Sequence, residues 1–109
     1  MILNKELWEI LVPTTRRKDG KTYAVGYHKI WDKEVERISG GMTLNVPAKG
    51  RWHHKGERVE ERMIPVRILC TEKEIDAIID FTLVYYDQLT VMAYRISDKV
   101  ILRNREDSK

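Results

Sequence analysis

The chain has 109 residues, which is enough for one domain with a modest core and too few for two. A hydrophobic content of 42% and a charged content of 34% are typical of a folded globular protein and exclude an intrinsically disordered one. The formal net charge of +3 is compatible with a polyanionic partner but does not require one.

Cysteine usage and hydropathy indicate the compartment. The single cysteine, Cys70, excludes an internal disulfide, which favours a reducing environment. The first residues lack the charged lead and apolar core of a signal peptide, and no apolar run approaches the roughly 20 residues that span a bilayer. We therefore expect a cytoplasmic protein without a membrane partner, forming a single domain over residues 1–109 with a frayed tail over 103–109.

The first predicted strand, residues 7–12, is apolar on both faces, a pattern typical of a central strand, and Pro13 ends it. Residues 14–22 follow as a polar and basic loop, with a turn signal at Asp19-Gly20 around which a small hairpin could form. This loop is either a solvated connection or one that reaches phosphate, because arginine pairs bidentately with phosphate oxygens.

A helix is predicted over residues 27–39, and Gly40-Gly41 supply its left-handed stop. Its apolar stripe is interpreted as core rather than as a cofactor site. The members of that stripe are Tyr27, Trp31, Val35 and Ile38. Residues 42–46 then alternate apolar and polar side chains, which predicts a half-buried strand.

Two glycines, Gly50 and Gly56, bracket a segment rich in cations, imidazoles and one indole, which we interpret as the loop of an elaborated hairpin over residues 49–58. The return strand, residues 59–70, contains Pro65, which cannot donate to a ladder and should sit at a bulge or an unpaired side. The core-facing residues of this strand are predicted to be Ile64, Val66, Ile68 and an inert, buried Cys70.

Thr71 and Glu74 form a capping box that opens a helix running to about Tyr86. Phe81 and Val84 lie opposite its core stripe, where a helix facing water should not place them. We therefore expect an interface between copies of the chain at Phe81 and Val84, the alternative being that the C-terminal tail covers them. The predicted core stripe consists of Ile75, Ile78, Ile79, Thr82 and Tyr86.

A last strand is predicted over residues 90–96, broken at 97–99 and resumed over 100–102, either beyond a bulge or as a short extra strand. The order of elements is strand, helix, strand, strand, helix, strand. This order predicts an α+β, ferredoxin-like βαββαβ fold, with two helices on one face of an antiparallel sheet.

That topology brings the basic loop, the hairpin loop and the end of the second helix to one edge of the sheet. The two loops each carry a net charge of +3, whereas the whole chain carries +3, so the remainder is acidic. An anion would be attracted to this edge, and its aromatic side chains could stack on a ring. The predicted ligand-binding residues are Arg16, Arg17, Lys18, Arg51, Trp52, His53, His54, Arg58 and Tyr86.

Catalytic and metal-binding patterns are weak. Adjacent histidines in an extended segment point to opposite sides, so His53 and His54 make a poor chelate, with His28 as a distant third ligand, and we expect no metal and no cofactor. Either His53 or His54 could act as a general acid or donate to a phosphate. The chain has no Walker loop, no dinucleotide fingerprint and no nucleophile elbow, which favours a non-catalytic protein.

Several short features carry a resemblance over residues 31–102. They are Gly50-Arg51-Trp52, then Gly56 and Glu60-Glu61 before an apolar strand, the acidic capped helix from Thr71, and a broken last strand. In these features the chain resembles a family of small bacterial and phage-type proteins of unknown function with a ferredoxin-like fold, and departs from it over residues 13–22. The resemblance implies the fold and adds no activity.

Three functions follow in order of preference. The first is a non-catalytic binder of a small anionic ligand, such as a nucleotide or cyclic nucleotide, built as a homo-oligomer; a phage-type sequestering protein would fit. The second is a nucleic-acid-binding accessory protein that uses the same edge, although the sheet lacks the aromatic–glycine signature of RNA-recognition folds. The third is a small enzyme that acts on a phosphorylated substrate.

Overall fold

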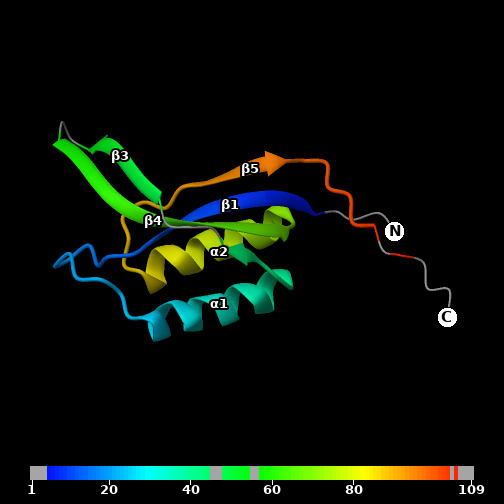
Figure 1. Ribbon diagram of the computed structural model, residues 1–109, viewed down its shortest axis with the longest axis horizontal. Coiled ribbons are helices and arrows are strands. Elements are labelled where there is room, and N and C mark those ends of the chain that lie inside the picture. The colour runs from blue at the N-terminus through cyan, green and yellow to red at the C-terminus, as the bar shows by residue number, and fades with distance from the viewer. Residues whose placement is uncertain (1–4, 45–47, 55–56, 104, 106–109) are drawn as a thin grey trace.

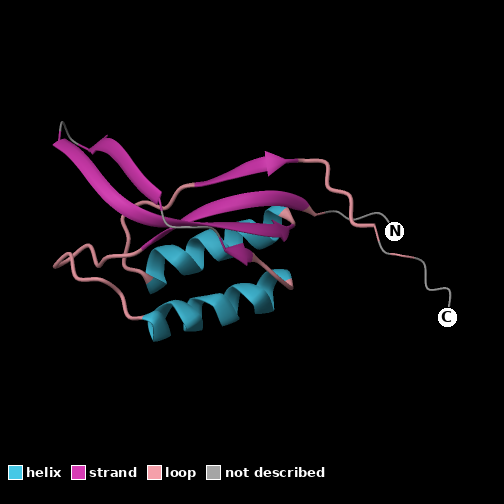
Figure 2. Ribbon diagram, viewed as in Figure 1, coloured by secondary structure: helices cyan, strands magenta, loops and turns pink. Residues whose placement is uncertain are grey.

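The computed structural model describes the backbone of residues 5–44, 48–54, 57–103 and 105, and the side chains of these residues outside 43–61. The chain forms a five-stranded sheet with all described pairings antiparallel. Two helices lie side by side on one face of this sheet, as Figures 1 and 2 show. The predicted ferredoxin-like α+β fold is confirmed.

The strand order along the sheet is β2-β4-β1-β5, and β3 pairs with β4 beyond the end of β2. The predicted central position of the first strand is therefore confirmed, because β1 lies between β4 and β5. The predicted strand over residues 42–46 is found as β2. The predicted hairpin loop over residues 49–58 is wrong for most of its length, because residues 48–54 form β3 and pair with β4 from Glu57 onward. The bounds of the strands are β1 Glu6–Pro13, β2 Thr43–Leu44, β3 Ala48–His54, β4 Glu57–Cys70 and β5 Ala93–Ser97.

The long strand β4 has different partners along its length. Its first half pairs with β3, and from Met63 onward it pairs with β1. Pro65 lies opposite Leu11, whose N–H donates to Met92 O at 3.0 Å, on the side away from β4. On its other side, Pro65 falls between the ladder to β2, which ends at Val66, and the ladder to β3. No described residue pairs with Pro65 on that side, and the prediction of a bulge or an unpaired side there stays a prediction, because residues 45–47 lie outside the described part of the chain.

The helices are α1, Val25–Ser39, and α2, Glu72–Tyr85. Gly40 ends α1 in the left-handed conformation, with φ 90° and its N–H donating to Glu36 O. Thr71 and Glu74 form the predicted capping box at the start of α2. The core between sheet and helices consists of Ile10, Val12, Trp31, Val35, Val66, Ile68, Cys70, Ile75, Ile78 and Tyr86.

The predicted strand at residues 100–102 is wrong, because no strand follows β5 in the described part of the chain. A local turn ends β5: Lys99 N–H donates to Ser97 Oγ at 3.1 Å. Beyond this turn Ile101 is 65% and Leu102 61% exposed, so neither has a strand edge or a core to join. The described part of the tail therefore does not cover Val84, which is 82% exposed, or Phe81 in its own chain. Most of the predicted frayed segment, 103–109, lies outside the described residues.

The predicted meeting of loops at one end of the molecule is confirmed. The loop between β1 and α1, the β3–β4 hairpin and the carboxyl end of α2 lie at the end opposite both chain termini (Figure 1). In the described part of the chain, no helix is long and apolar enough to cross a membrane.

Candidate functional site

The carboxyl end of α2 is closed by donors from other elements. Its last carbonyls, at residues 82–84, accept from the backbone of residues 86–88. The carbonyls of Tyr85 and Tyr86 accept from two tyrosine side chains in and just before α1. The hydroxyl of Tyr27 donates to Tyr85 O, and the hydroxyl of Tyr23 donates to Tyr86 O at 2.7 Å. Carbonyls at a helix end need such partners when the helix cannot supply them. This end of α2 is thus neutralised without a basic residue in its last turn.

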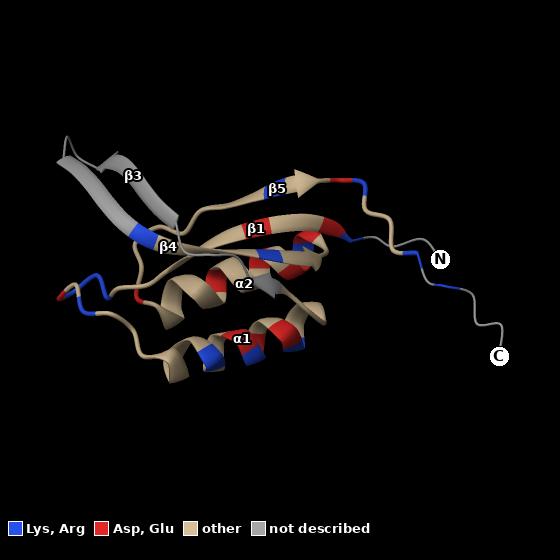
Figure 3. Ribbon diagram, viewed as in Figure 1, with Lys and Arg blue, Asp and Glu red and all other residues tan. Residues whose placement is uncertain are grey.

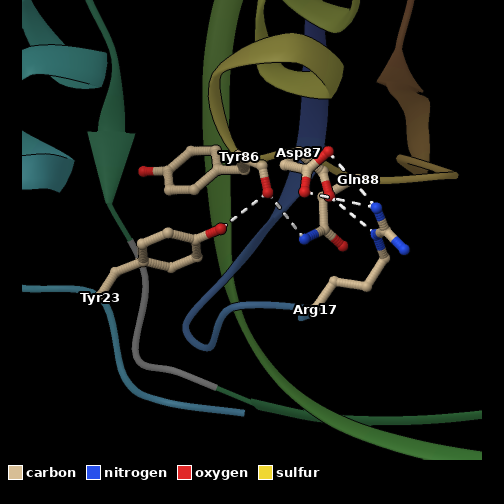
Figure 4. A network of polar contacts seen from close by, with 5 residues as sticks. All are labelled: Arg17, Tyr23, Tyr86, Asp87 and Gln88. Carbon is tan, nitrogen blue, oxygen red and sulfur yellow. Dashed lines mark hydrogen bonds and ion pairs between the residues drawn. The ribbon is translucent and has the colours of Figure 1, made fainter. Parts of the chain in front are cut away.

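Arg17 and Gln88 complete this closure, as Figure 4 shows. Gln88 Nε2 donates to Tyr86 O at 3.0 Å, and Arg17 Nε donates to Asp87 O at 3.0 Å. The guanidinium of Arg17 also lies 3.3 Å from the Asp87 carboxylate. Both partners of that ion pair are substantially exposed, so it contributes little stability and can exchange for another anion.

Four aromatic rings form a stack from the loop after β1 across both helices. Tyr23 stacks on Tyr27 with centroids 4.8 Å apart, and Tyr27 stacks on Tyr85 at 4.2 Å. Phe81 continues the stack on Tyr85 at 5.2 Å. Tyr27 and Tyr85 are also joined by reciprocal hydrogen bonds, since each hydroxyl donates to the carbonyl of the other. The stack fixes the relative position of the two helix ends.

A histidine contacts the buried tyrosine at the end of α2. His28 Nδ1 lies 2.6 Å from the hydroxyl of Tyr86. Burial raises the pKa of Tyr86 well above its usual range, so its hydroxyl stays protonated and donates to His28. Burial also lowers the pKa of His28, an effect opposed by Asp32 one turn further along α1. The neutral form of His28 is therefore favoured, and accepting from Tyr86 at Nδ1 places its proton on Nε2; the side chain is partly accessible.

The amino end of α1 lies beside the carboxyl end of α2 but lacks a comparable set of hydrogen-bond partners. Its N-cap is Ala24, which has the extended N-cap backbone conformation but no side chain that could accept from the helix. The first turn contains no acidic residue. The first N–H groups of a helix and its dipole together favour an anion. The positive end of α1 is therefore left uncompensated by its own chain in the described region.

The loop over residues 14–22 forms the small hairpin that its turn signal at Asp19-Gly20 allows. Thr15 and Thr22 form an isolated bridge, and Gly20 turns the chain with φ 72°. Arg16 pairs with Asp19, and this hydrogen bond lowers the pKa of Asp19 to about 2. Figure 3 shows the cations gathered on this loop, at the same end as the start of α1.

Lys18 and Lys21 are exposed on this loop, and no described carboxylate forms an ion pair with either of them. Arg62, also exposed, lies on β4 within the β3–β4 ladder, and its carbonyl accepts from Thr14 Oγ1 at 2.8 Å. Five described cations and two carboxylates meet at this end of the molecule, which leaves three positive charges. The cations are Arg16, Arg17, Lys18, Lys21 and Arg62.

The structure distributes the predicted ligand residues unevenly. Arg16 and Arg17 already have carboxylate partners, and Lys18 is exposed at the same end. Tyr86 is fully buried in the core, so its ring does not face the surface as a ligand contact would require. The remaining ones, whose side chains lie outside the described residues, are Arg51, Trp52, His53, His54 and Arg58.

Sequence reasoning missed two features of this end. Asp87 was not counted in its charge, although it offsets Arg17. His28 was weighed only as a distant metal ligand, yet the four-residue spacing of His28 and Asp32 on one helix face is a readable signal for an acid–base pair. Its contact with Tyr86 joins residues 58 positions apart and has no local signal.

A hollow with a volume of about 300 Å³ lies at the opposite end of the sheet. Lys5 lies at this hollow and donates to Ser39 O at 2.8 Å. Arg67 contributes a guanidinium whose Nε is engaged by Glu9 at 3.2 Å. In the described ranges, no group of three or more histidine, cysteine or acidic side chains is arranged to hold a metal ion.

Comparison with solved structures supports the fold. The chain is similar to the divalent cation tolerance protein CutA1 from Thermus thermophilus, with 14% identity and a TM-score of 0.64 over 94% of this chain and 89% of that one. It is also similar to CutA from Xylella fastidiosa, with 15% identity and a TM-score of 0.66 over 92% and 88%. Neither a protein-family model nor a curated protein matches the sequence.

A third similar structure is a phage SAM lyase in complex with S-methyl-5′-thioadenosine, with 14% identity and a TM-score of 0.67 over 90% of this chain and 84% of that one. At such identities the likeness concerns the fold alone. The expected resemblance to small ferredoxin-like proteins thus holds at the level of the fold.

Proposed function

We propose that this protein binds a small anionic ligand of the nucleotide class at the end where α1 begins, without transforming it. The observation that carries the proposal is the contrast between the two helix ends there. The negative end of α2 is satisfied by Arg17, Gln88 and two tyrosines, whereas the positive end of α1 has no acceptor from its own cap. An anion at this place gains both the helix N–H groups and nearby cations.

Lys18 and Lys21 are the described cations best suited to this role, because they are exposed and without a described carboxylate partner. Arg17 is a further candidate, since its exposed pairing with Asp87 can be exchanged for a phosphate. Arg51 and Arg58 of the hairpin remain predicted contacts. The aromatic part of the proposed ligand is supported by one similar structure of the same fold, the phage SAM lyase in complex with S-methyl-5′-thioadenosine.

Isothermal titration with adenosine 5′-monophosphate and with S-methyl-5′-thioadenosine tests the proposal, because the second probe lacks the phosphate. We expect the monophosphate to bind more tightly. Each of Lys18→Ala, Lys21→Ala, Arg51→Ala and Arg58→Ala should weaken its binding by about 1.5–3 kcal/mol if the side chain makes a charged hydrogen bond. Lys73→Ala serves as the control, since Lys73 is exposed on the first turn of α2, at the far end.

Unchanged affinity in all four variants would contradict the proposal. Binding that is confined to oligonucleotides and falls steeply with salt would instead favour the nucleic-acid alternative.

A second candidate, an enzyme acting on a nucleoside, is favoured by one specific observation. His28 is partly accessible, is held in one tautomer by Tyr86, and lies in the first turns of α1 beside the proposed site. One similar structure of this fold is that of a phage SAM lyase. Incubating the protein with S-adenosylmethionine and separating the products by chromatography tests this candidate: turnover that disappears in His28→Gln would support it, and absence of turnover would reject it.

A further inference from the structure

Exposed apolar side chains are concentrated in the last part of the chain. Among the described residues, most of the large hydrophobic side chains that face solvent follow α2 in one continuous segment. Clustered exposure of this kind marks a surface that another chain covers. These residues are Leu89, Met92, Tyr94, Ile96, Ile101 and Leu102.

The end of this segment, residues 98–105, combines three apolar residues with flanking cations. Val100, Ile101 and Leu102 are consecutive, and Ile101 and Leu102 are more than half exposed. The cations are Lys99, Arg103 and Arg105, against one acid, Asp98, which leaves a net charge of +2. The turn at Ser97 directs this tail away from the sheet, as Figure 1 shows.

The outer face of α2 has the complementary character. Glu72, Asp76 and Asp80 are exposed at four-residue spacing, and no ion pair to them is found in the part of the chain that is described. Beside this acidic row Val84 is 82% exposed, and Phe81 is half-buried. The row has a net charge of −2 once the exposed Lys73 is included.

The length of the extended tail also matches the length of α2. The eight residues of the tail span roughly 26 Å when extended, at about 3.3 Å per residue. The 14 residues of α2 span roughly 21 Å, at about 1.5 Å per residue. An extended tail can therefore run along the whole helix, with its cations near the acidic row and its apolar residues near Phe81 and Val84.

We propose that residues 98–105 of one copy of the chain lie along the outer face of α2 of a second copy. The occupant is a second copy rather than the same chain, because the turn after β5 sends the tail away from its own α2. The contact buries the apolar run, covers Val84 and pairs Lys99 and Arg103 with Asp76 and Asp80. Phe81 and Val84 lie toward the carboxyl end of α2, at the same end of the molecule as the proposed ligand site, but the contact uses neither Lys18 nor Lys21.

Cross-linking between two variants that each carry one added cysteine tests this arrangement. Val84→Cys and an isotope-labelled Ile101→Cys are purified separately, mixed and oxidised. Cys70 is fully buried, and burial raises the pKa of its thiol to about 12, so it does not react. We expect a covalent pair containing one copy of each variant. Val25→Cys replaces Val84→Cys in the control, since Val25 is 70% exposed but lies on α1.

A mixed pair that forms at least about ten times faster than the control pair supports the proposal. Equal rates overturn it, as does a Val84→Cys/Ile101→Cys double variant that cross-links only within its own chain. Asp76→Lys with Asp80→Lys should abolish the mixed pair, and adding Lys99→Glu with Arg103→Glu should restore it. Failure of this charge exchange to restore cross-linking would also count against the docking.

Discussion

The carboxyl end of α2 and the amino end of α1 lie together at the basic end of the molecule, and they differ in how their backbone groups are satisfied. At α2, carbonyls beyond the reach of the helix backbone accept from Tyr23, Tyr27, Arg17 and Gln88. At α1, the cap is an alanine and the first turn has no acid. Both ends belong to dipoles of similar size, but only the negative end is neutralised by side chains, whereas the positive end has neither a side-chain cap nor an acid in its first turn. Side chains from distant segments thus satisfy the carboxyl end of α2, whereas the amino end of α1 has no side-chain cap.

The largest effect at the carboxyl end of α2 is expected from removal of the buried ring of Tyr86. Tyr86→Ala should lower the free energy of unfolding by about 3–5 kcal/mol, because it empties a core position and leaves His28 Nδ1 without its donor. Urea unfolding followed by circular dichroism measures this change. Leu89→Ala, three residues later and exposed, should change stability by less than about 0.5 kcal/mol. Equal losses in both variants would contradict the assignment of Tyr86 to the core.

A substitution at Ala24 can supply the missing N-cap at the amino end of α1. Ala24→Asp should raise the free energy of unfolding by about 1 kcal/mol, because the backbone at Ala24 already has N-cap geometry with φ −66° and ψ 151°. The same change should weaken binding of adenosine 5′-monophosphate, since the carboxylate occupies the helix N–H groups. Ala24→Ser supplies a neutral cap and separates capping from charge. Thermal unfolding and titration calorimetry on the same samples give both effects, and tighter binding by Ala24→Asp would contradict the interpretation of this end as an anion site.

Tyr27 and Tyr85, whose hydroxyls donate to each other's carbonyls, offer a matched pair of substitutions. Tyr27→Phe leaves Tyr85 O at the helix end without its donor, which should cost about 1 kcal/mol. Tyr85→Phe removes a donor from Tyr27 O, which lies inside α1 and is already in reach of the helix backbone. We therefore expect a smaller loss in Tyr85→Phe, measured by chemical denaturation. The reverse order would show that the hydroxyls matter for another reason than closing α2.

The smallest effect is a dependence of stability on pH. The pKa of His28 is lowered from 6.5 in the folded protein, mainly by burial, so the unfolded chain binds the proton more readily. Stability should then decrease as the pH falls below about 6.5, within a window above the titration of the carboxylates. Unfolding at pH 7.5 and 5.5 measures this decrease. In His28→Gln the decrease should be smaller, and an identical pH dependence would exclude His28 as its source.

Local signals account for most of the predicted fold. The capping box at Thr71 and the glycine stop at Gly40 fix helix ends through residues a few positions apart, and both are found as predicted. The run over residues 100–102 shows the limit of such signals. Its composition favours a strand, but a strand also needs a free edge to pair with, and the turn at Ser97 leads the chain away from one.

The candidate site was predictable only in outline. Topology brought the basic loop and the end of α2 together, and the charge of Lys18 could be read directly. The partners of Arg17 and His28 could not be read, because Asp87 and Tyr86 are 70 and 58 residues away from them. Tyr86 was predicted both as core and as a ligand contact, and helical periodicity alone identified the role that burial now supports.

The double partnership of β4 has a consequence for how the protein opens. Its amides from Val66 onward belong to the ladders with β1 and β2, whereas residues 57–62 are described in a ladder with β3 alone. Pro65 stands at the boundary and has no amide proton. Amide exchange should therefore divide this single strand into a slow segment that opens only with the whole domain and a faster segment that opens with the hairpin. One strand thus contains the border between two cooperative units, so the β3–β4 hairpin can open while the rest of the sheet remains intact.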